Sequence, residues 1–305
     1  MSAYDPLHGF DGELNTGRLD IEYNARATVS PECFAATMQD YLDATASARI
    51  HCLARADLPY SEDSGGPRLD LYGTNPGERR PAVMFIHGGY WRALTKEHSG
   101  FMASMLADRG IATIVPDYRL APDASLAEIV HDVRSALAFT WHRGARLGID
   151  RERITLCGSS AGGHLAASCI QPGWQVAYGL PDIAVRTALP VSGLFHLGPI
   201  ARCHPQAWLS LSGEDVLHLS PLLKPPVRPA ASHMRITVAL AASEAEGFKR
   251  QSMAYHEALL AAGVSSSLLE IAGRNHFDVV LDLADPQSQL ARTLLDLVTS
   301  DHQTA

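Results

Sequence analysis

Short runs of apolar residues, each of strand length, alternate along the chain with longer amphipathic segments. The clearest runs are Ala82–Ile86, Ala112–Val115 and Ile154–Cys157. Uninterrupted apolar runs of this kind are typical of parallel strands that helices cover on both faces. Residues 124–147, by contrast, have apolar side chains at helical spacing, at Leu126, Ile129, Val130, Val133 and Leu137.

The same alternation continues on both sides of this region. Ser30 followed by Pro31 marks a helix start. We expect further strands at 68–72, 187–191, 236–241 and 267–271, and further helices at 31–55, 96–109, 163–170, 248–262 and 286–300. This order predicts an α/β fold, a doubly wound and mostly parallel sheet with helices on both faces and right-handed crossovers.

The length of 305 residues fits one large domain. Within it, we expect residues 1–60 to form an N-terminal arm or cap helix that packs on a core at 61–305. Residues 195–232 are rich in proline and have little periodicity. An insertion of this kind between late strands is expected to form part of a pocket wall.

One five-residue motif follows a predicted buried strand and precedes a predicted helix. Gly158-Ser159-Ser160-Ala161-Gly162 matches G-x-S-x-G, in which the central serine sits on a sharp, strained turn and its neighbours two residues away must be small. The pattern alone is weak, but this setting makes it strong. Ser160, rather than Ser159, is therefore the predicted nucleophile, and the competing interpretation is a glycine-rich turn at a strand end.

A serine hydroxyl needs a base to take its proton. When the nucleophile turn lies in a fold of alternating strands and helices, the acid and then the histidine follow the serine along the chain. His276 lies in the loop after the last predicted strand, so it is the predicted base. The competing His233 and His256 fall before a strand and within a helix. A surface histidine is the alternative interpretation of His276.

The acid should follow the preceding strand, at 236–241. Glu244 and Glu246 both lie there. We prefer Glu244 because it is nearer the strand end, with the role of orienting the imidazole. Asp is more usual at this position, and either glutamate could instead be an ordinary solvated carboxylate.

Backbone N–H groups must stabilise the anion that forms on the substrate. Ala161, after the nucleophile, supplies one donor, and Gly88 and Gly89 after the strand 82–86 are expected to supply the others. Tyr90 and Trp91 are predicted to bind substrate, with core packing as the alternative for both. We expect His87 to order the loop rather than to act as a second base.

Composition narrows the partners. A net charge of −8 disfavours nucleic acid and anionic membranes, and no apolar run is long enough to span a membrane. The five cysteines are odd in number and lack a CxxC spacing, and no signal peptide is visible, so reduced thiols in a cytoplasmic protein are expected. Despite 14 histidines there is no metal-binding spacing, so we expect neither metal nor cofactor.

With these residues placed, the chain resembles the arylformamidase (kynurenine formamidase) branch of the α/β hydrolases, near the hormone-sensitive-lipase-like esterases. The resemblance covers about residues 68–295 and rests on the segments 87–91, 117–122, 158–164, 248–252 and 275–277. It implies an α/β-hydrolase fold and assigns nucleophile, acid and base to Ser160, Glu244 and His276. The family usually has Asp as the acid, so Glu244 departs from the pattern.

The resemblance implies a metal-independent serine hydrolase that cleaves a small-molecule aryl formamide of the N-formyl-L-kynurenine type. The alternative is a broad carboxylesterase or amidase for small aryl esters, short-acyl esters or carbamates. A remote alternative is an inactive hydrolase fold that serves as a binding module. Oligomeric state is not encoded in any pattern found, so a homodimer stays open.

Overall fold

The computed structural model describes residues 10–61, 65–227 and 233–299, and its centre is a single twisted sheet. The strand order is β1-β2-β4-β3-β5-β6-β7-β8. The strands from β4 to β8 pair in parallel, whereas β1 and β2 are antiparallel to their neighbours. Their bounds are β1 Leu53–Pro59, β2 Arg68–Tyr72, β3 Arg80–Ile86, β4 Ala112–Pro116, β5 Ile149–Ser159, β6 Thr187–Val191, β7 Arg235–Ser243 and β8 Ser265–Asn275.

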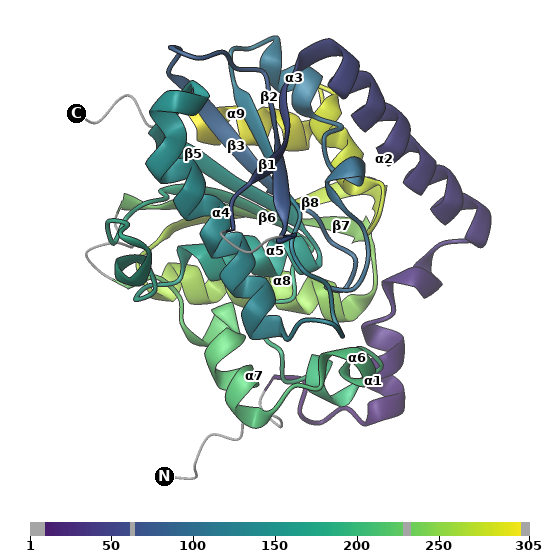
Figure 1. The fold of residues 1–305 in the computed structure, drawn as a ribbon. Coiled ribbons are helices and arrows are strands. Elements are labelled where there is room, and N and C mark those ends of the chain that lie inside the picture. The colour runs from purple at the N-terminus through teal and green to yellow at the C-terminus, as the bar shows by residue number, and fades with distance from the viewer. Residues whose placement is uncertain (1–9, 62–64, 228–232, 300–305) are drawn as a thin grey trace.

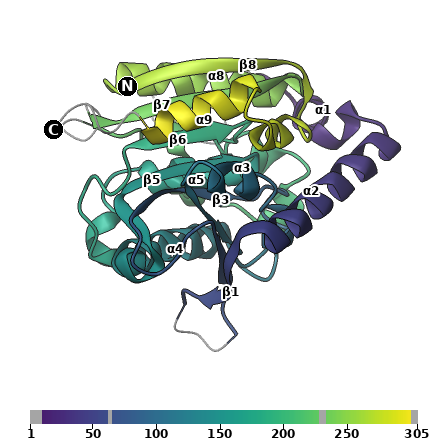
Figure 2. The ribbon, with the colours of Figure 1, turned by 90° about the horizontal axis from the view of Figure 1, so that it is seen from above.

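Helices cover both faces of the sheet (Figures 1 and 2). Successive side chains of a strand point to opposite faces. Met84 and Ile86 accordingly join the apolar core beneath α4 (Leu126–Leu147), α5 (Ala161–Ile170) and α8 (Glu246–Ala261). Val83 and Phe85 join a second core beneath α2 (Pro31–Cys52), α3 (Ala103–Ala107) and α9 (Gln289–Thr299). The expected doubly wound α/β architecture is confirmed.

Two predicted helices differ from the structure. The helix expected at 31–55 ends at Cys52, and the chain continues directly into β1, which pairs with β2 at the sheet edge. The helix expected at 96–109 is broken into a 3-10 turn at Lys96–His98 and the short α3. Gly100 lies at the break, where its N–H donates to Thr45 Oγ1 of α2 at 3.0 Å. A Cβ at Gly100 would lie 3.0 Å from Thr45 Cγ2 of α2 and 3.0 Å from the Tyr72 hydroxyl of β2, so tight packing against both elements replaces helical hydrogen bonding there.

The proline-rich insertion lies beside the N-terminal arm. The segment contains α6 (Gln206–Leu209), α7 (Gly213–Leu219) and 3-10 turns at Ile200–Arg202 and Pro221–Leu223, and Figure 1 shows α6 next to α1 (Thr16–Glu22). Arg202 donates to the carbonyl of Leu14 at 2.6 Å, and the N–H of His204 donates to Asp20 at 2.6 Å. Further 3-10 turns lie at Ala25–Thr28, Gln175–Tyr178 and Val279–Ala284. In the described ranges, no helix is both long and apolar enough to cross a membrane.

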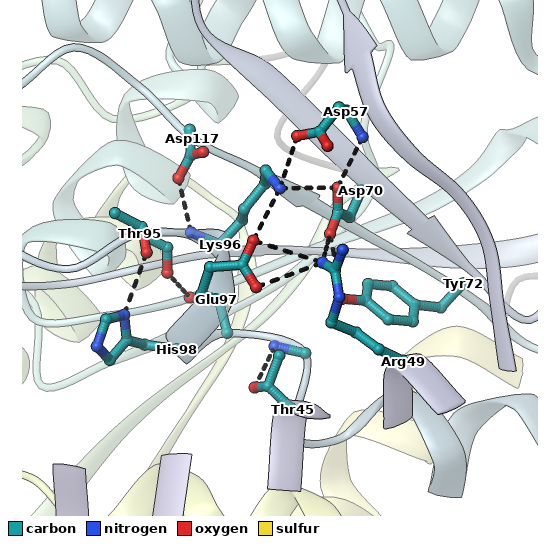
Figure 3. A network of polar contacts seen from close by, with 12 residues as sticks. Thr45, Arg49, Asp57, Asp70, Tyr72, Thr95, Lys96, Glu97, His98 and Asp117 are labelled. Atoms are coloured by element: carbon teal, nitrogen blue, oxygen red, sulfur yellow. Dashed lines mark hydrogen bonds and ion pairs between the residues drawn. The ribbon is translucent and has the colours of Figure 1, made fainter. Parts of the chain in front are cut away.

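A cluster of charges with Asp70 and Lys96 buried at its centre joins α2 and β1 to the rest of the sheet (Figure 3). Asp70 of β2 is fully buried and forms ion pairs with Arg49 of α2 and with Lys96 Nζ, the latter at 3.0 Å. Lys96 also contacts Asp57 of β1 at 2.9 Å and Glu97 at 3.1 Å. Burial alone would lower the pKa of Lys96, but its hydrogen bonds to these carboxylates outweigh burial and raise it. Lys96 therefore stays charged, and its ion pairs join β1, β2 and the turn at Lys96–His98.

We expect Lys96→Met to lower the free energy of unfolding by about 3 kcal/mol, because it leaves the buried Asp70 carboxylate with one cation fewer. The control is Lys249→Met, which removes a half-exposed pair with Glu246 at 3.0 Å and should cost less than about 1 kcal/mol. Chemical denaturation of both variants measures the difference. Equal losses in the two variants would contradict a structural role for the Lys96 cluster.

Candidate active site

Ser160 lies on the tight turn between β5 and α5. Its φ of 57° and ψ of −118° are unusual for a residue with a side chain. A Cβ at Gly162 would lie 2.0 Å from the carbonyl oxygen of Ile86, and one at Gly158 would lie 2.3 Å from that of Gly162. The N–H of Ser160 donates to Val191 of β6 at 2.8 Å. Both glycines are thus required by close backbone approach, and the turn directs the Ser160 side chain to the carboxyl edge of the sheet.

Glu244 and His276 follow directly after the neighbouring parallel strands β7 and β8, so they meet at the same edge. His276 Nδ1 lies 2.7 Å from Glu244 Oε2, and both side chains are buried. An ionised carboxylate can only accept, so this contact places the hydrogen on Nδ1 and leaves Nε2 free to accept a proton. The second oxygen of Glu244 accepts from the N–H of Ala241 at 3.3 Å. Ser160 and His276 line one cavity of about 480 Å³.

The other acid and base candidates lie elsewhere. Glu246 is exposed in the first turn of α8 and pairs with Lys249. His256 is further along α8, where its Nδ1 contacts Ser266 Oγ at 2.8 Å. His233 is exposed just before β7. Of these candidate acids and bases, Glu244 and His276 contact each other, and His276 lines the cavity.

Tyr118 holds the turn that follows β3, the strand that pairs with β5 just before Ser160. The Tyr118 hydroxyl lies 2.9 Å from the carbonyl oxygen of His87 and 3.0 Å from that of Gly88. Burial raises the pKa of Tyr118, so the hydroxyl keeps its proton and can donate. In a trans peptide the C=O and the following N–H point in opposite directions. Two carbonyls turned toward Tyr118 therefore turn the N–H groups of Gly88 and Gly89 away from it.

The N–H groups of Gly88 and Gly89 belong to a turn that packs against Ser160. A Cβ at Gly88 would lie 3.3 Å from Ser160 Cβ, and Gly89 has a φ of +92°. Gly88, Gly89 and Ser160 all line the cavity, and Ala161 begins α5 directly after Ser160. The three predicted backbone donors thus belong to two turns that meet at Ser160.

His87 is a buried part of this turn. Its ring stacks on Tyr118 with centroids 4.1 Å apart, and its Nδ1 lies 3.0 Å from the carbonyl oxygen of Gly88. Burial lowers its pKa to about 4, so the imidazole is neutral at pH 7. These contacts fit the ordering role expected for His87.

Tyr90 and Trp91 take different places. Tyr90 lines the cavity, and its hydroxyl donates to the carbonyl of Tyr23 in the N-terminal arm. Trp91 is fully buried in the core and contacts His164, with ring centroids 5.1 Å apart. Trp91 does not line the cavity, and its burial fits the core-packing interpretation.

Much of the cavity wall comes from segments in which the sequence indicated no particular residue. The N-terminal arm contributes Asn24, Ala25, Arg26, Phe34, Met38 and Tyr41, and the insertion contributes His204 and Trp208. The apolar face of α2 is a usable signal only for Phe34, Met38 and Tyr41, which repeat at helical spacing. The others lie in turns or, in the case of Trp208, in the single-turn helix α6, which are too short for periodicity, so only tertiary contacts could reveal them.

The segment 248–252 connects the arm to the catalytic edge. The Phe248 ring lies 4.3 Å from that of His276. Arg250 donates to Asp11 at 2.9 Å and to Glu22 at 3.1 Å, and Gln251 donates to the hydroxyl of Tyr23 at 3.1 Å. The first turns of α8 therefore contact both the arm and the imidazole of His276.

One group of side chains in the described segments has the composition of a metal site. Ligand atoms of Asp20, Cys203 and His204 lie within 4.8 Å of one another. Burial raises the pKa of the Cys203 thiol to about 12 and lowers that of His204. The thiol is thus protonated at neutral pH, which opposes metal binding unless the metal displaces the proton.

Comparison with known proteins places this geometry in a class. Residues 69–169 match the family model BD-FAE. Kynurenine formamidase of Salmo salar is 31% identical over 84% of this chain and 86% of its own length. A probable isoprenylcysteine alpha-carbonyl methylesterase of Oryza sativa subsp. japonica is 29% identical over 77% of this chain and 60% of its own. A crystal structure of a candidate thioesterase from Silicibacter sp. TM1040 has a TM-score of 0.74 at 26% identity, covering 92% of this chain and 98% of that one.

Fold, nucleophile turn and relatives together define a serine hydrolase of the α/β-hydrolase class. Within that class, the chain belongs to the kynurenine formamidase family. The resemblance drawn from the sequence is confirmed. The relatives comprise formamidases and esterases, so the enzyme is an arylformamidase or an esterase.

We expect Tyr118→Phe to lower kcat by about 10- to 100-fold with little change in KM, because two peptide groups lose the contact that aims their N–H donors. The matched control is Tyr60→Phe, which removes a hydroxyl bonded to the neighbouring carbonyl of Asp117. Steady-state kinetics on any turned-over ester or formamide measures both. A similar kcat loss in the two variants would show that Tyr118 contributes only to general stability.

Proposed function

We propose that this protein hydrolyses an aryl formamide of the N-formyl-L-kynurenine type through an acyl-enzyme formed on Ser160. The observation that carries the proposal is the 2.7 Å contact between Glu244 and His276, a histidine that lines the same cavity as Ser160. A carboxylate, an imidazole and a serine on a strained turn are the parts that nucleophilic acyl transfer requires.

The proposed reaction begins when Ser160 Oγ attacks the acyl carbon and His276 Nε2 takes its proton. Glu244 stabilises the imidazolium that forms. The anionic oxygen is held by the N–H groups of Gly88, Gly89 and Ala161. His276 then protonates the departing amine, and water activated by the same histidine releases formate from Ser160.

The cavity wall supports an aromatic leaving group. Phe34, Tyr90, Trp208 and Phe277 present rings to the space in front of Ser160. Phe34 packs edge-on against Phe277 at a centroid distance of 5.0 Å, and Tyr90 contacts Trp208 in the same way at 6.2 Å. Rings that bind an aryl group by stacking or edge contact suit the kynurenine side of such a substrate.

The second candidate is a carboxylesterase for small aryl or short-acyl esters. The methylesterase relative supports it, and the chemistry of the proposed triad is the same for an ester carbonyl. The two functions differ in substrate preference rather than in catalytic residues.

Exchange of each candidate acid for its amide separates their roles. Glu244→Gln should lower kcat by about 10³- to 10⁴-fold because a neutral amide no longer stabilises the imidazolium or fixes the tautomer. The matched Glu246→Gln should retain nearly full kcat, since Glu246 is exposed and faces Lys249. Ser160→Ala should lower kcat by about 10⁶-fold, and this residual rate is the reference for activity without the nucleophile. If Glu246→Gln were the more damaging change, the acid would be misassigned.

Turnover of N-formyl-L-kynurenine and of p-nitrophenyl acetate by the same preparation tests the substrate. We expect the higher kcat/KM for the formamide, unchanged after treatment with a chelator, and a fluorophosphonate probe should label Ser160. If kcat/KM for the ester were higher by several orders of magnitude, the protein would be a carboxylesterase rather than a formamidase. Absence of labelling would instead favour an inactive binding module.

A further inference from the structure

The charges on the cavity wall differ from those of the chain as a whole. The protein has 33 acidic and 25 basic side chains and a net charge of −8. Among the described residues, however, the cavity is lined by two arginines, Arg26 and Arg92, and by no aspartate or glutamate. Burial lowers the pKa values of His98 and His204, which also line it. Arg26 and Arg92 are therefore permanent positive charges on a wall that is otherwise mostly apolar.

Both guanidinium groups lie over aromatic rings of the same wall, and Arg26 also interacts electrostatically with Glu32 of α2. Arg92 lies over the Trp208 ring at 4.3 Å, and Arg26 lies over the Phe34 ring at 4.5 Å. Within the described ranges, neither forms an ion pair, in contrast to the buried clusters around Arg49 and Arg250. Arg26 donates one N–H to the carbonyl of Val29 at 3.0 Å. Stacking on a ring face leaves the in-plane N–H donors of a guanidinium available to an anion.

Each arginine is fixed relative to one part of the catalytic machinery. The backbone N–H of Arg92 donates to Gly89 at 3.0 Å, and Trp208 Nε1 donates to the carbonyl of Tyr90 at 3.0 Å. Arg92 therefore continues the turn that carries the oxyanion donors. On the other side, Phe34 beneath Arg26 packs on Phe277, the residue after His276.

We propose that Arg92, assisted by Arg26, binds a carboxylate on the leaving-group part of the substrate. The substrate class is then an aryl formamide or aryl ester that carries an anionic group remote from the scissile carbonyl. Hydrogen bonds from guanidinium to carboxylate are charge-assisted and directional, and both arginines are exposed, so an incoming anion can reach them. This inference rests on the proposed hydrolysis at Ser160 but not on the choice between formamide and ester.

The test uses two matched substrate pairs, each with one anionic and one neutral member. The formamide pair is N-formyl-L-kynurenine and its α-carboxamide, and the ester pair is 4-acetoxyphenylacetate and 4-acetoxyphenylacetamide. Within each pair, the ratio of kcat/KM for the anionic member to that for the neutral member reports the carboxylate alone.

We expect Arg92→Gln to lower this ratio by about 10- to 100-fold, the range of a charge-assisted hydrogen bond, and Arg26→Gln to lower it less. Arg92→Lys should restore part of the ratio, and rising ionic strength should reduce it in the unmodified protein. The control is Arg143→Gln, an exposed arginine of α4 outside the cavity, which should leave the ratio unchanged.

Two outcomes separate the inference from the proposed function. If only the esters are turned over, the formamidase assignment fails, whereas the ratio in the ester pair still reports on Arg92. If Arg92→Gln lowers both members of a pair equally, Arg92 merely packs against Trp208, and the carboxylate site is overturned.

Discussion

The close approach of three backbone segments around Ser160 is the constraint on which the active site depends. The carbonyl of Ile86 lies where a Cβ of Gly162 would be, and the carbonyl of Gly162 lies where a Cβ of Gly158 would be. This contact locks the end of β3 against the start of α5. The turn 87–89 is the direct continuation of β3, so the same contact fixes the position of Gly88 and Gly89 relative to Ser160. Parallel pairing of β5 to β8 then brings Glu244 and His276 to the same edge.

The N-terminal arm is a structural part of the site rather than an appendage. β1 is an edge strand of the sheet, and the charge cluster at Lys96 ties α2 and β1 to β2 (Figure 3). Two buried tyrosine hydroxyls then connect the arm to the catalytic turns. Tyr41 of α2 donates to the carbonyl of Phe277, and Tyr90 donates to the carbonyl of Tyr23. Stability of the arm and the shape of the cavity are therefore coupled.

The sequence alone predicts the parts of this molecule that depend on backbone regularity. Buried parallel strands are continuous apolar runs, and the nucleophile turn requires glycine at 158 and 162, so the central sheet, Ser160 and the location of His276 follow from local pattern. Proximity to a strand end favoured Glu244 over Glu246. The break at Gly100 and the strand Leu53–Pro59 could not be predicted, because packing against α2 and pairing with β2 decide them. Trp91 and Trp208 are equally aromatic in sequence, yet only Trp208 faces the cavity, which long-range contacts determine.

Two kinds of constraint therefore shape the cavity: backbone geometry at the strand ends and side-chain packing in the wall. Ser160, Glu244 and His276 are held by backbone geometry at the ends of parallel strands, which tolerates little variation. Much of the cavity wall is built from side chains of the arm and the insertion, which are joined to that frame by a few hydrogen bonds and stacked arginines. Substitutions in the wall can therefore change which leaving group is bound while the frame around Ser160 is preserved. This separation explains why formamidases and esterases occur among the relatives of one chain with one nucleophile turn.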